Sequence, residues 1–220
     1  MRELRPGLWH WETPHPDWKS SEPWNEQVSS YAIDDGQRLL LFDPLGVPAE
    51  IEERADARQP VVVLTAPWHE RDTRSLVERL NTPVFAPPPD TAEDLMQKYG
   101  LTREQAGDGS PDLAWLRAGD RVEGHFYSVG DRLSVGAEVF PGREHNDVVL
   151  WIEDRRAVIA GDSLVDFGRG LEVPAEWLRD GVTREGVADG LRPLLERPVE
   201  LVLPAHGDPT DRAALERALS

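Results

Sequence analysis

The chain has 220 residues, enough to bury one substantial hydrophobic core, so we expect a single domain over residues 1–220. Its formal net charge of -17 works against binding to a nucleic-acid backbone or to an anionic membrane surface. It contains no cysteine, which excludes disulfides and thiolate ligands and leaves His, Asp and Glu as the strong metal ligands.

The composition also bears on the compartment and the partners of this acidic protein. No apolar run approaches the roughly 20 residues that a transmembrane helix requires, and the first residues do not lead into an apolar signal segment. We therefore expect a soluble, cytoplasmic protein that binds a small molecule, with neither nucleic acid nor membrane as a partner. The sequence leaves open whether the chain forms a homo-oligomer.

The first 27 residues are rich in Trp and Pro, a composition that favours irregular extended structure held by buried rings. We predict an N-terminal arm over residues 1–27. Two strands follow at 28–33 and 39–42. A tight turn joins them, because Asp35-Gly36 supplies the positive φ that hairpin turns require.

Helical and strand patterns alternate through the rest of the chain. A helix is predicted over residues 49–57, and a strand follows at 61–64 that is apolar on both faces, as in a strand covered on both sides. Residues 87–117 are interpreted as an insertion with one helix at 92–99. The remaining predicted elements, in chain order, are a helix that begins near residue 72 with Asp72 suited to cap it, strands at 84–86, 121–127, 132–140, 148–152 and 157–160, a helix at 184–195, a strand at 199–203 and a helix at 210–219.

Strands in two groups, separated by helices with one apolar face each, indicate two packed sheets with helices outside. Four strand ends carry polar motifs, which read Thr65-Ala66-Pro67-Trp68-His69-Glu70-Arg71, Pro141-Gly142-Arg143-Glu144-His145, Gly161-Asp162 and Ala205-His206-Gly207. Their order and spacing resemble the metallo-β-lactamase superfamily, whose members carry Thr-His-x-His-x-Asp-His, Pro-Gly-His, Gly-Asp and a late Gly-His-Gly. The resemblance runs from about residue 28 to the end and leaves out residues 87–117. It implies an α/β (α+β) fold, an αββα sandwich of two mixed β-sheets with helices on the outer faces.

The resemblance also implies that most metal ligands of the family have been replaced. The corresponding positions here read Ala66, Trp68, Glu70, Arg71 and Arg143. An alkyl group, an indole and a guanidinium cannot ligate a metal, so Glu70 is the one position in this set that still offers a donor. Asp162, which corresponds to the usual bridging carboxylate, and His206 persist.

We favour a metal-free or metal-poor pocket, in which Arg71 and Arg143 balance buried carboxylates in place of the ions. Such a pocket is expected to bind or act on a small polar or anionic molecule. His206 is the expected general base, paired with Asp162, and hydrolysis is the expected class if the protein is catalytic. The residues predicted to contact the substrate are Arg71, Arg143, Trp68, His69 and His145.

Two other interpretations stay open. One is a mononuclear metallohydrolase that holds zinc or another divalent metal at Glu70, Asp162 and His206, assisted by His69 or His145. The other is a non-catalytic interaction module that keeps only the sandwich. His69 occupies a spacer position of its motif, so its side chain is expected to point away from the ligand positions.

Overall fold

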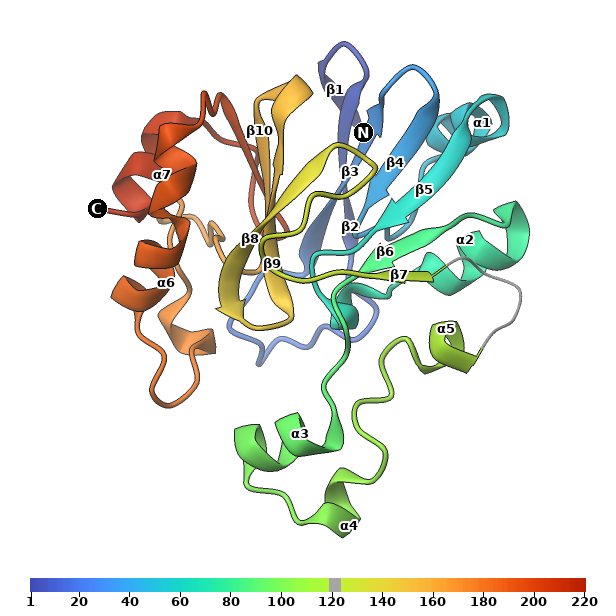
Figure 1. The fold of residues 1–220 in the computed structure, drawn as a ribbon. Helices are drawn as coiled ribbons and strands as arrows, with labels where there is room; N and C mark the ends of the chain where they lie inside the picture. The colour runs from blue at the N-terminus through green and yellow to red at the C-terminus, as the bar shows by residue number, and fades with distance from the viewer. Residues whose placement is uncertain (119–123) are drawn as a thin grey trace.

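The structure, a computed structural model, describes residues 1–118 and 124–220. In these residues two β-sheets pack face to face and helices cover their outer faces (Figure 1). Each sheet contains both parallel and antiparallel neighbours. The predicted αββα sandwich of two mixed sheets is confirmed.

The larger sheet has seven described strands in simple chain order. They are β1 (Arg2–Arg5), β2 (Leu8–Pro14), β3 (Gln27–Asp34), β4 (Arg38–Phe42), β5 (Gln59–Val63), β6 (Val84–Ala86) and β7 (Gly124–Phe126). The first four pair antiparallel, and β4 to β7 pair parallel. The turn between β3 and β4 forms as predicted, with Gly36 at a φ of 95°.

The smaller sheet has four described strands, in the order β11-β10-β9-β8. Their bounds are β8 (Ala137–Glu144), β9 (Asp147–Ile152), β10 (Ala157–Gly161) and β11 (Leu201–Pro204). Since β10 is parallel to β11 and antiparallel to β9, which is antiparallel to β8, the strands β8, β10 and β11 end at the same edge.

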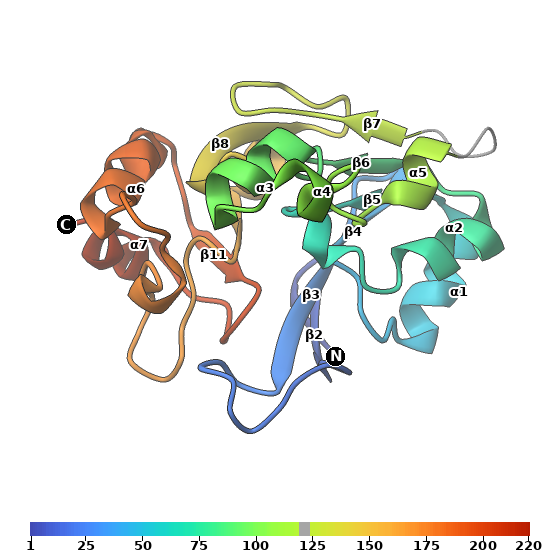
Figure 2. The same cartoon turned by 90° about the horizontal axis from the view of Figure 1, so that it is seen from below.

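The helices fall into two flanking layers and one projecting segment (Figure 1). Apolar residues of α1 (Ala49–Ala57) and α2 (Thr73–Leu80) pack on the larger sheet, and those of α6 (Arg184–Leu191) and α7 (Arg212–Ala218) pack on the smaller one. A third apolar cluster fills the space between the sheets. Between β6 and β7 the chain forms α3 (Ala92–Tyr99), α4 (Arg103–Ala106) and α5 (Ala114–Ala118). Of these, α3 and α4 project past the strand ends (Figure 1) and lie in front of the strands when the molecule is seen from below (Figure 2).

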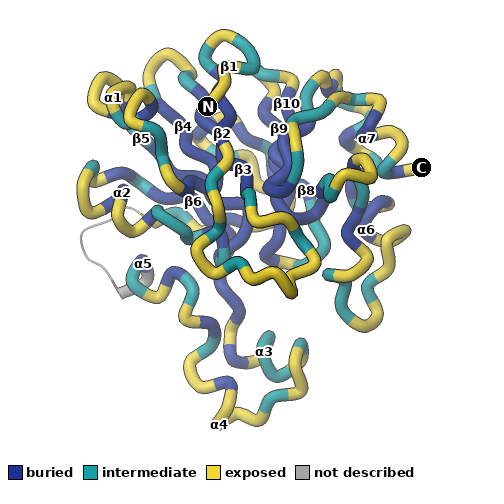
Figure 3. The backbone as a smooth tube through the Cα atoms, turned by 180° about the vertical axis from the view of Figure 1, so that it is seen from behind, coloured by how far each residue is buried: buried dark blue, intermediate teal, exposed yellow. Residues whose placement is uncertain are grey.

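Two predictions about local structure are wrong. The N-terminal arm is not irregular throughout, because β1 and β2 extend the larger sheet and pairing with β3 satisfies the backbone hydrogen-bonding groups of β2. Trp9 and Trp11 of β2 pack in the apolar cluster on the outer face of this sheet. Only the part between β2 and β3 is irregular, and it is mostly exposed (Figure 3). The strand predicted at 132–140 lies later and continues to Glu144, since β9 pairs with it along its length.

The strand predicted at 121–127 begins in residues that lie outside the described part, which contains β7 from Gly124. Within the described residues, every helix is too short or too polar to span a lipid bilayer.

Candidate functional site

The polar motifs meet at one edge of the sandwich because their strands end there. Asp43 follows β4 and Thr65 follows its parallel neighbour β5. In the other sheet Asp162 and His206 follow the parallel pair β10 and β11. The close approach of the sheets requires glycine at position 161, where a Cβ atom would lie 2.7 Å from Thr65 Oγ1 and where φ is 53°.

His69 lies between two carboxylates, which corrects the prediction that it points away. It ends a single 3₁₀ turn, Pro67–His69, in which side chains do not alternate between two faces as they do in a strand. Its Nδ1 is 3.1 Å from Asp43 Oδ2, and its Nε2 is 3.3 Å from Asp162 Oδ1. Burial lowers the pKa of the ring, but the attraction of Asp162 and Asp43 outweighs burial and raises the pKa of His69 to about 9. The ring is therefore an imidazolium ion at neutral pH.

Asp162 is surrounded by donors and cations. Trp68 Nε1 donates to its Oδ2 at 3.0 Å, and Arg143 Nη2 lies 3.3 Å from the same oxygen. His206 Nε2 lies 3.5 Å from Oδ1. Burial would raise the pKa of this carboxyl, but the charge of His69 and the hydrogen bonds from His206 and His69 hold the pKa of Asp162 well below its usual range. Asp162 is thus a buried carboxylate whose oxygens already contact protein N–H groups.

Asp162 and the side chains around it, those of Trp68, His69, Arg143 and His206, form a cluster that also contains Asp147. The sequence did not lead us to predict Asp147 as a member. Its side chain is fully buried, and its Oδ2 lies 2.7 Å from Arg143 Nε. Burial, with repulsion from Asp162, outweighs the attraction of Arg143 and raises the pKa of Asp147 to about 7. Gly142 permits this packing, since a Cβ atom there would lie 2.1 Å from the backbone oxygen of Asp147. The available signal was an acidic residue at the start of an otherwise apolar strand, β9.

Arg71 lies in the same wall but contacts backbone rather than a carboxylate. Its Nη1 donates to the carbonyl oxygens of Ser29 at 3.2 Å and Asp43 at 2.7 Å, so it joins the ends of β3 and β4. The residue itself has a φ of 42°, a left-handed conformation that turns the chain from the 3₁₀ turn into α2. Arg71 therefore interacts with the buried carboxylates of Asp43 and Asp162 by electrostatic attraction rather than by direct hydrogen bonds.

Glu70 does not join Asp162 and His206, which removes it from the predicted alternative ligand set. Its carboxylate accepts hydrogen bonds from the backbone nitrogen of Leu113 at 2.9 Å and from Trp115 Nε1 at 2.5 Å, both in the segment between β6 and β7. The prediction that Asp72 caps α2 is also wrong. No side-chain cap hydrogen bond forms, and Asp72 Oδ2 accepts instead from the backbone nitrogen of Gly46.

The cluster opens into a cavity of about 320 Å³. Its walls are His15, Trp24, Val28, Trp68, His69, Arg71, Arg143, Asp162, Trp177 and His206. Aromatic rings crowd around His206, whose ring centroid lies 5.1 Å from that of Trp24 and 5.2 Å from that of Trp177. Burial lowers the pKa of His206 more than Asp162 raises it, so this ring is neutral at pH 7. The structure thus brings together Arg71, Arg143, Trp68, His69, Asp162 and His206, and the segment between β2 and β3 completes the cavity.

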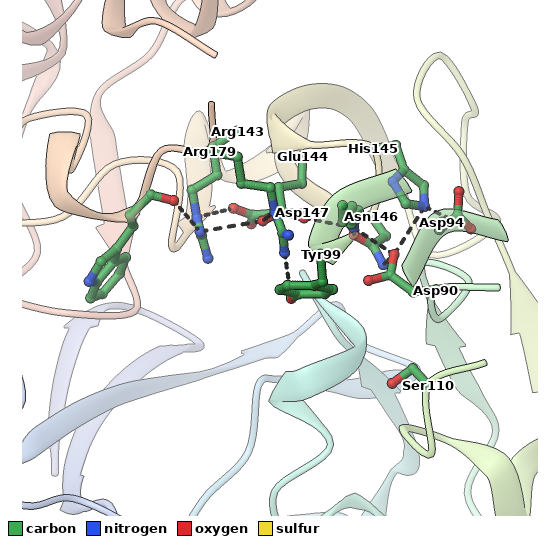
Figure 4. Close-up of polar contacts among 12 residues, drawn as sticks. Asp90, Asp94, Tyr99, Ser110, Arg143, Glu144, His145, Asn146, Asp147 and Arg179 are labelled. Carbon is green, nitrogen blue, oxygen red and sulfur yellow. Dashed lines mark hydrogen bonds and ion pairs between the residues drawn. The ribbon is translucent and has the colours of Figure 1, made fainter. Parts of the chain in front are cut away.

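His145 is the predicted contact residue that lies elsewhere. It lines a separate cleft of about 840 Å³, between α3 and residues 178–182, in which Arg143 is the residue shared with the cavity. In this cleft the carboxylate of Glu144 accepts a hydrogen bond from Arg179 Nε at 2.7 Å (Figure 4). It also accepts one from Lys98 Nζ at 2.7 Å. His145 lies in the turn between β8 and β9, and it lines the cleft but not the cavity beside Asp162.

The same cleft holds the one group among the described residues whose geometry could hold a metal ion. Asp90, Asp94 and His145 offer donor atoms within 4.8 Å of one another (Figure 4). However, Lys98 Nζ lies 2.6 Å from Asp90 Oδ1, and Asp94 Oδ2 already accepts from Thr91 at the start of α3. The ammonium group of Lys98 already pairs with one of the two carboxylates in this group.

Comparison with models of known protein families and with curated proteins gave no match. Solved structures match over most of the chain. DIM-1 metallo-β-lactamase has 12% identity and a TM-score of 0.65, covering 99% of this chain and 93% of its own. TTHA1623, solved in a di-iron-bound form, has 24% identity and a TM-score of 0.57, covering 87% and 93%. TTHA1429 of Thermus thermophilus, described as a metallo-β-lactamase family protein, has 19% identity and a TM-score of 0.57, covering 98% and 78%. At these identities the likeness is one of fold.

Proposed function

We propose that this chain, which has the metallo-β-lactamase fold, is a hydrolase-like protein that binds a small anionic molecule in the cavity beside Asp162 without a metal ion. The observation that carries the proposal is the set of partners of this one carboxylate. Trp68, Arg143 and His69 approach it at 3.0, 3.3 and 3.3 Å, so hydrogen donors and cations surround the oxygens that a metal would need.

The donor set around Asp162 does not fit a divalent ion. Ala66 has no donor atom, and the indole of Trp68 and the guanidinium of Arg143 offer only N–H groups. Both ring nitrogens of His69 already face carboxylates, those of Asp43 and Asp162, and Glu70 is held by Leu113 and Trp115. His206 is the remaining neutral nitrogen donor beside Asp162, and two ligands are fewer than the three protein ligands of catalytic zinc sites.

The charges that line the cavity favour an anion. Three of the lining residues are cations, Arg71, Arg143 and His69, and one is a carboxylate, Asp162. In a chain with a net charge of -17, this lining carries more cations than carboxylates. An anion that enters therefore has Arg71, Arg143 and His69 as possible partners.

Hydrolysis is the reaction that this cavity supports best. His206 lines it, is neutral at pH 7 and carries a buried Nδ1 with no hydrogen-bond partner among the described residues. As a general base it would take one proton from an attacking water and return it to the leaving oxygen, so the ester bond is exchanged for an alcohol and a carboxylic acid, which then releases its proton to solvent.

The proposal is tested with protein purified without added metal and treated with EDTA. We expect less than stoichiometric zinc, iron and manganese by elemental analysis, and binding of acetate that EDTA does not change. Esters that carry a free carboxylate, from acetoxyacetate to 4-acetoxybenzoate, should be hydrolysed by the wild type and not by His206→Gln. Loss of anion binding or of hydrolysis on EDTA treatment would show that a metal ion does the work.

The second candidate, a metal-dependent hydrolase, is favoured by one observation, the di-iron form of the similar structure TTHA1623. The variants His145→Ala and Asp162→Asn separate the two places where a metal could bind. Metal that is lost only from His145→Ala lies in the cleft and leaves the proposal standing. Metal that is lost only from Asp162→Asn lies in the cavity and contradicts it.

A further inference from the structure

We propose that the natural ligand of the cavity is a carboxylate on a single aromatic ring. This inference rests on the proposed function, because it names the class of anion that the same cavity takes. Three features of the cavity carry it: the aromatic rings in its walls, the sign of the charges beside them, and the fixed side chain that limits its size.

The aromatic walls are not part of the protein core. Trp24, Trp68 and Trp177 lie outside the three apolar clusters that hold the sandwich together, and each is only partly buried. The rings are nevertheless ordered around His206: Trp24 and Trp177 meet it edge to face, and Phe167 packs behind Trp177 with centroids 5.3 Å apart. Indole rings gathered at a cavity, away from the core, offer the surfaces on which a planar ring packs.

The charges specify what the ring carries. Arg71 and Arg143 lie in the same walls as the indoles, and both guanidinium groups are positively charged at neutral pH. His15 lines the opening, and burial together with the charge of Arg71 lowers the pKa of this ring, so it adds no charge at pH 7. A cationic substituent on the ring would be repelled by Arg71 and Arg143, and an anionic substituent would be attracted by them.

Arg143 limits the size of the ligand, because it separates the cavity from the larger cleft. Arg143 stands between the cavity and the larger cleft, and its guanidinium is fixed between Trp68 and Trp177, 5.4 Å from each ring centroid. Asp147 and Asp162 hold the same group at 2.7 and 3.3 Å. The wall is therefore rigid, and the volume of about 320 Å³ is at the lower end of ligand cavities.

Calorimetric titration of the wild type in EDTA tests ring, charge and size separately, with five probes: benzoate, cyclohexanecarboxylate, acetate, benzylamine and 2-naphthoate. We expect benzoate to bind roughly three- to tenfold more tightly than cyclohexanecarboxylate, since aromatic pairs gain beyond their buried area. Benzylamine should show no binding, and 2-naphthoate should bind at least about tenfold more weakly than benzoate.

Two variants locate the ring. Trp24→Leu, on an exposed segment away from the core, should bring the ratio between benzoate and cyclohexanecarboxylate close to one. Tyr99→Leu is the matched control, because Tyr99 is an aromatic residue of the neighbouring cleft with 57% exposure, and it should keep the wild-type ratio.

The possible results distinguish this inference from the proposed function. If all carboxylates bind but benzoate has no advantage, the aromatic class is wrong and the anion-binding cavity stands. If Tyr99→Leu rather than Trp24→Leu removes the advantage, the ring lies in the cleft and the inference is wrong. If none of the carboxylates binds, both proposals fail.

Discussion

The cluster around Asp162 and the rim of the neighbouring cleft, formed by Asp90, Asp94 and His145, contain similar charged groups in different surroundings. In the cluster, Asp147 and Asp162 have side-chain exposures of 0% and 8%, and each ion pair joins residues from different strand ends. On the rim, His145 and Asp94 have exposures of 46% and 32% and lie 3.9 Å apart. Water screens the rim charges and cannot screen the buried ones.

The stability of the fold should therefore depend on the buried ion pairs more than on the exposed ones. A buried carboxylate that loses its partner leaves an uncompensated charge in a low-dielectric interior, which costs several kcal/mol. When an exposed pair on the rim is broken, water solvates both charged groups, so the free energy of unfolding changes little. Substitutions in the cluster should therefore have large effects, and those on the rim should have small ones.

The largest effect is expected from Arg143→Met, which leaves Asp147 without its cation. We expect a loss of about 3–5 kcal/mol in the free energy of unfolding at pH 8, measured by urea denaturation. Adding Asp147→Asn should restore part of this loss. The matched control is Arg179→Met in the cleft, which should cost about 1 kcal/mol, since Glu144 keeps Lys98 as a partner. Equal losses in the two single variants would contradict the comparison.

The pH dependence of stability reports on His69. Because its folded pKa of about 9 lies above its ordinary value of 6.5, the folded state binds the proton more tightly than the unfolded state. The stabilisation is fully present below pH 6.5 and is lost as the pH rises through about 9. We expect a fall on the order of 2 kcal/mol over this window, which His69→Gln should flatten. An unchanged curve in His69→Gln would show that the ring is neutral in the folded protein.

Restoring the family's ligands should convert the cluster into a metal site. The triple variant Ala66→His, Trp68→His and Arg143→His replaces an alkyl group, an indole and a cation with three nitrogen donors beside Asp162. We expect its zinc affinity to exceed that of the wild type by at least about tenfold in a calorimetric titration. If the triple variant binds zinc no better, the correspondence of these positions with the family's motif is wrong.

The smallest effect is expected on the rim. His145→Gln removes contacts of 3.6 and 3.9 Å with Asp90 and Asp94, and it should change the free energy of unfolding by less than about 0.5 kcal/mol. A loss above about 2 kcal/mol would mean that the rim is as tightly coupled as the cluster.

Much of the fold could be predicted from the sequence because periodicity and turn chemistry are local properties. The helix at Ala49–Ala57 and the hairpin at Gly36 form where the sequence predicts them. The strands β1 and β2 were missed because Trp and Pro obscure the alternation, and only pairing with β3 makes this segment regular. Such pairing is a property of the tertiary structure.

The candidate site was predictable in part of its membership but not in its orientations. Motif order identified Asp162, Arg143 and His206, since strand ends gather at one edge. The inward position of His69 depends on a 3₁₀ turn of three residues, which sequence spacing alone does not distinguish from an extended loop. Asp147 was missed because its role comes from burial beside Arg143, across a turn that the sequence does not reveal.

The central claim is that protein donors, rather than a metal ion, surround Asp162. The most direct measurement is a crystal structure of protein supplied with zinc, with anomalous diffraction recorded at the zinc edge. We expect no anomalous peak within coordination distance of the Asp162 carboxylate, about 2.0–2.2 Å, and we expect Arg143 and Trp68 to donate hydrogen bonds to it. A strong peak at that distance, with Arg143 displaced, would contradict the account.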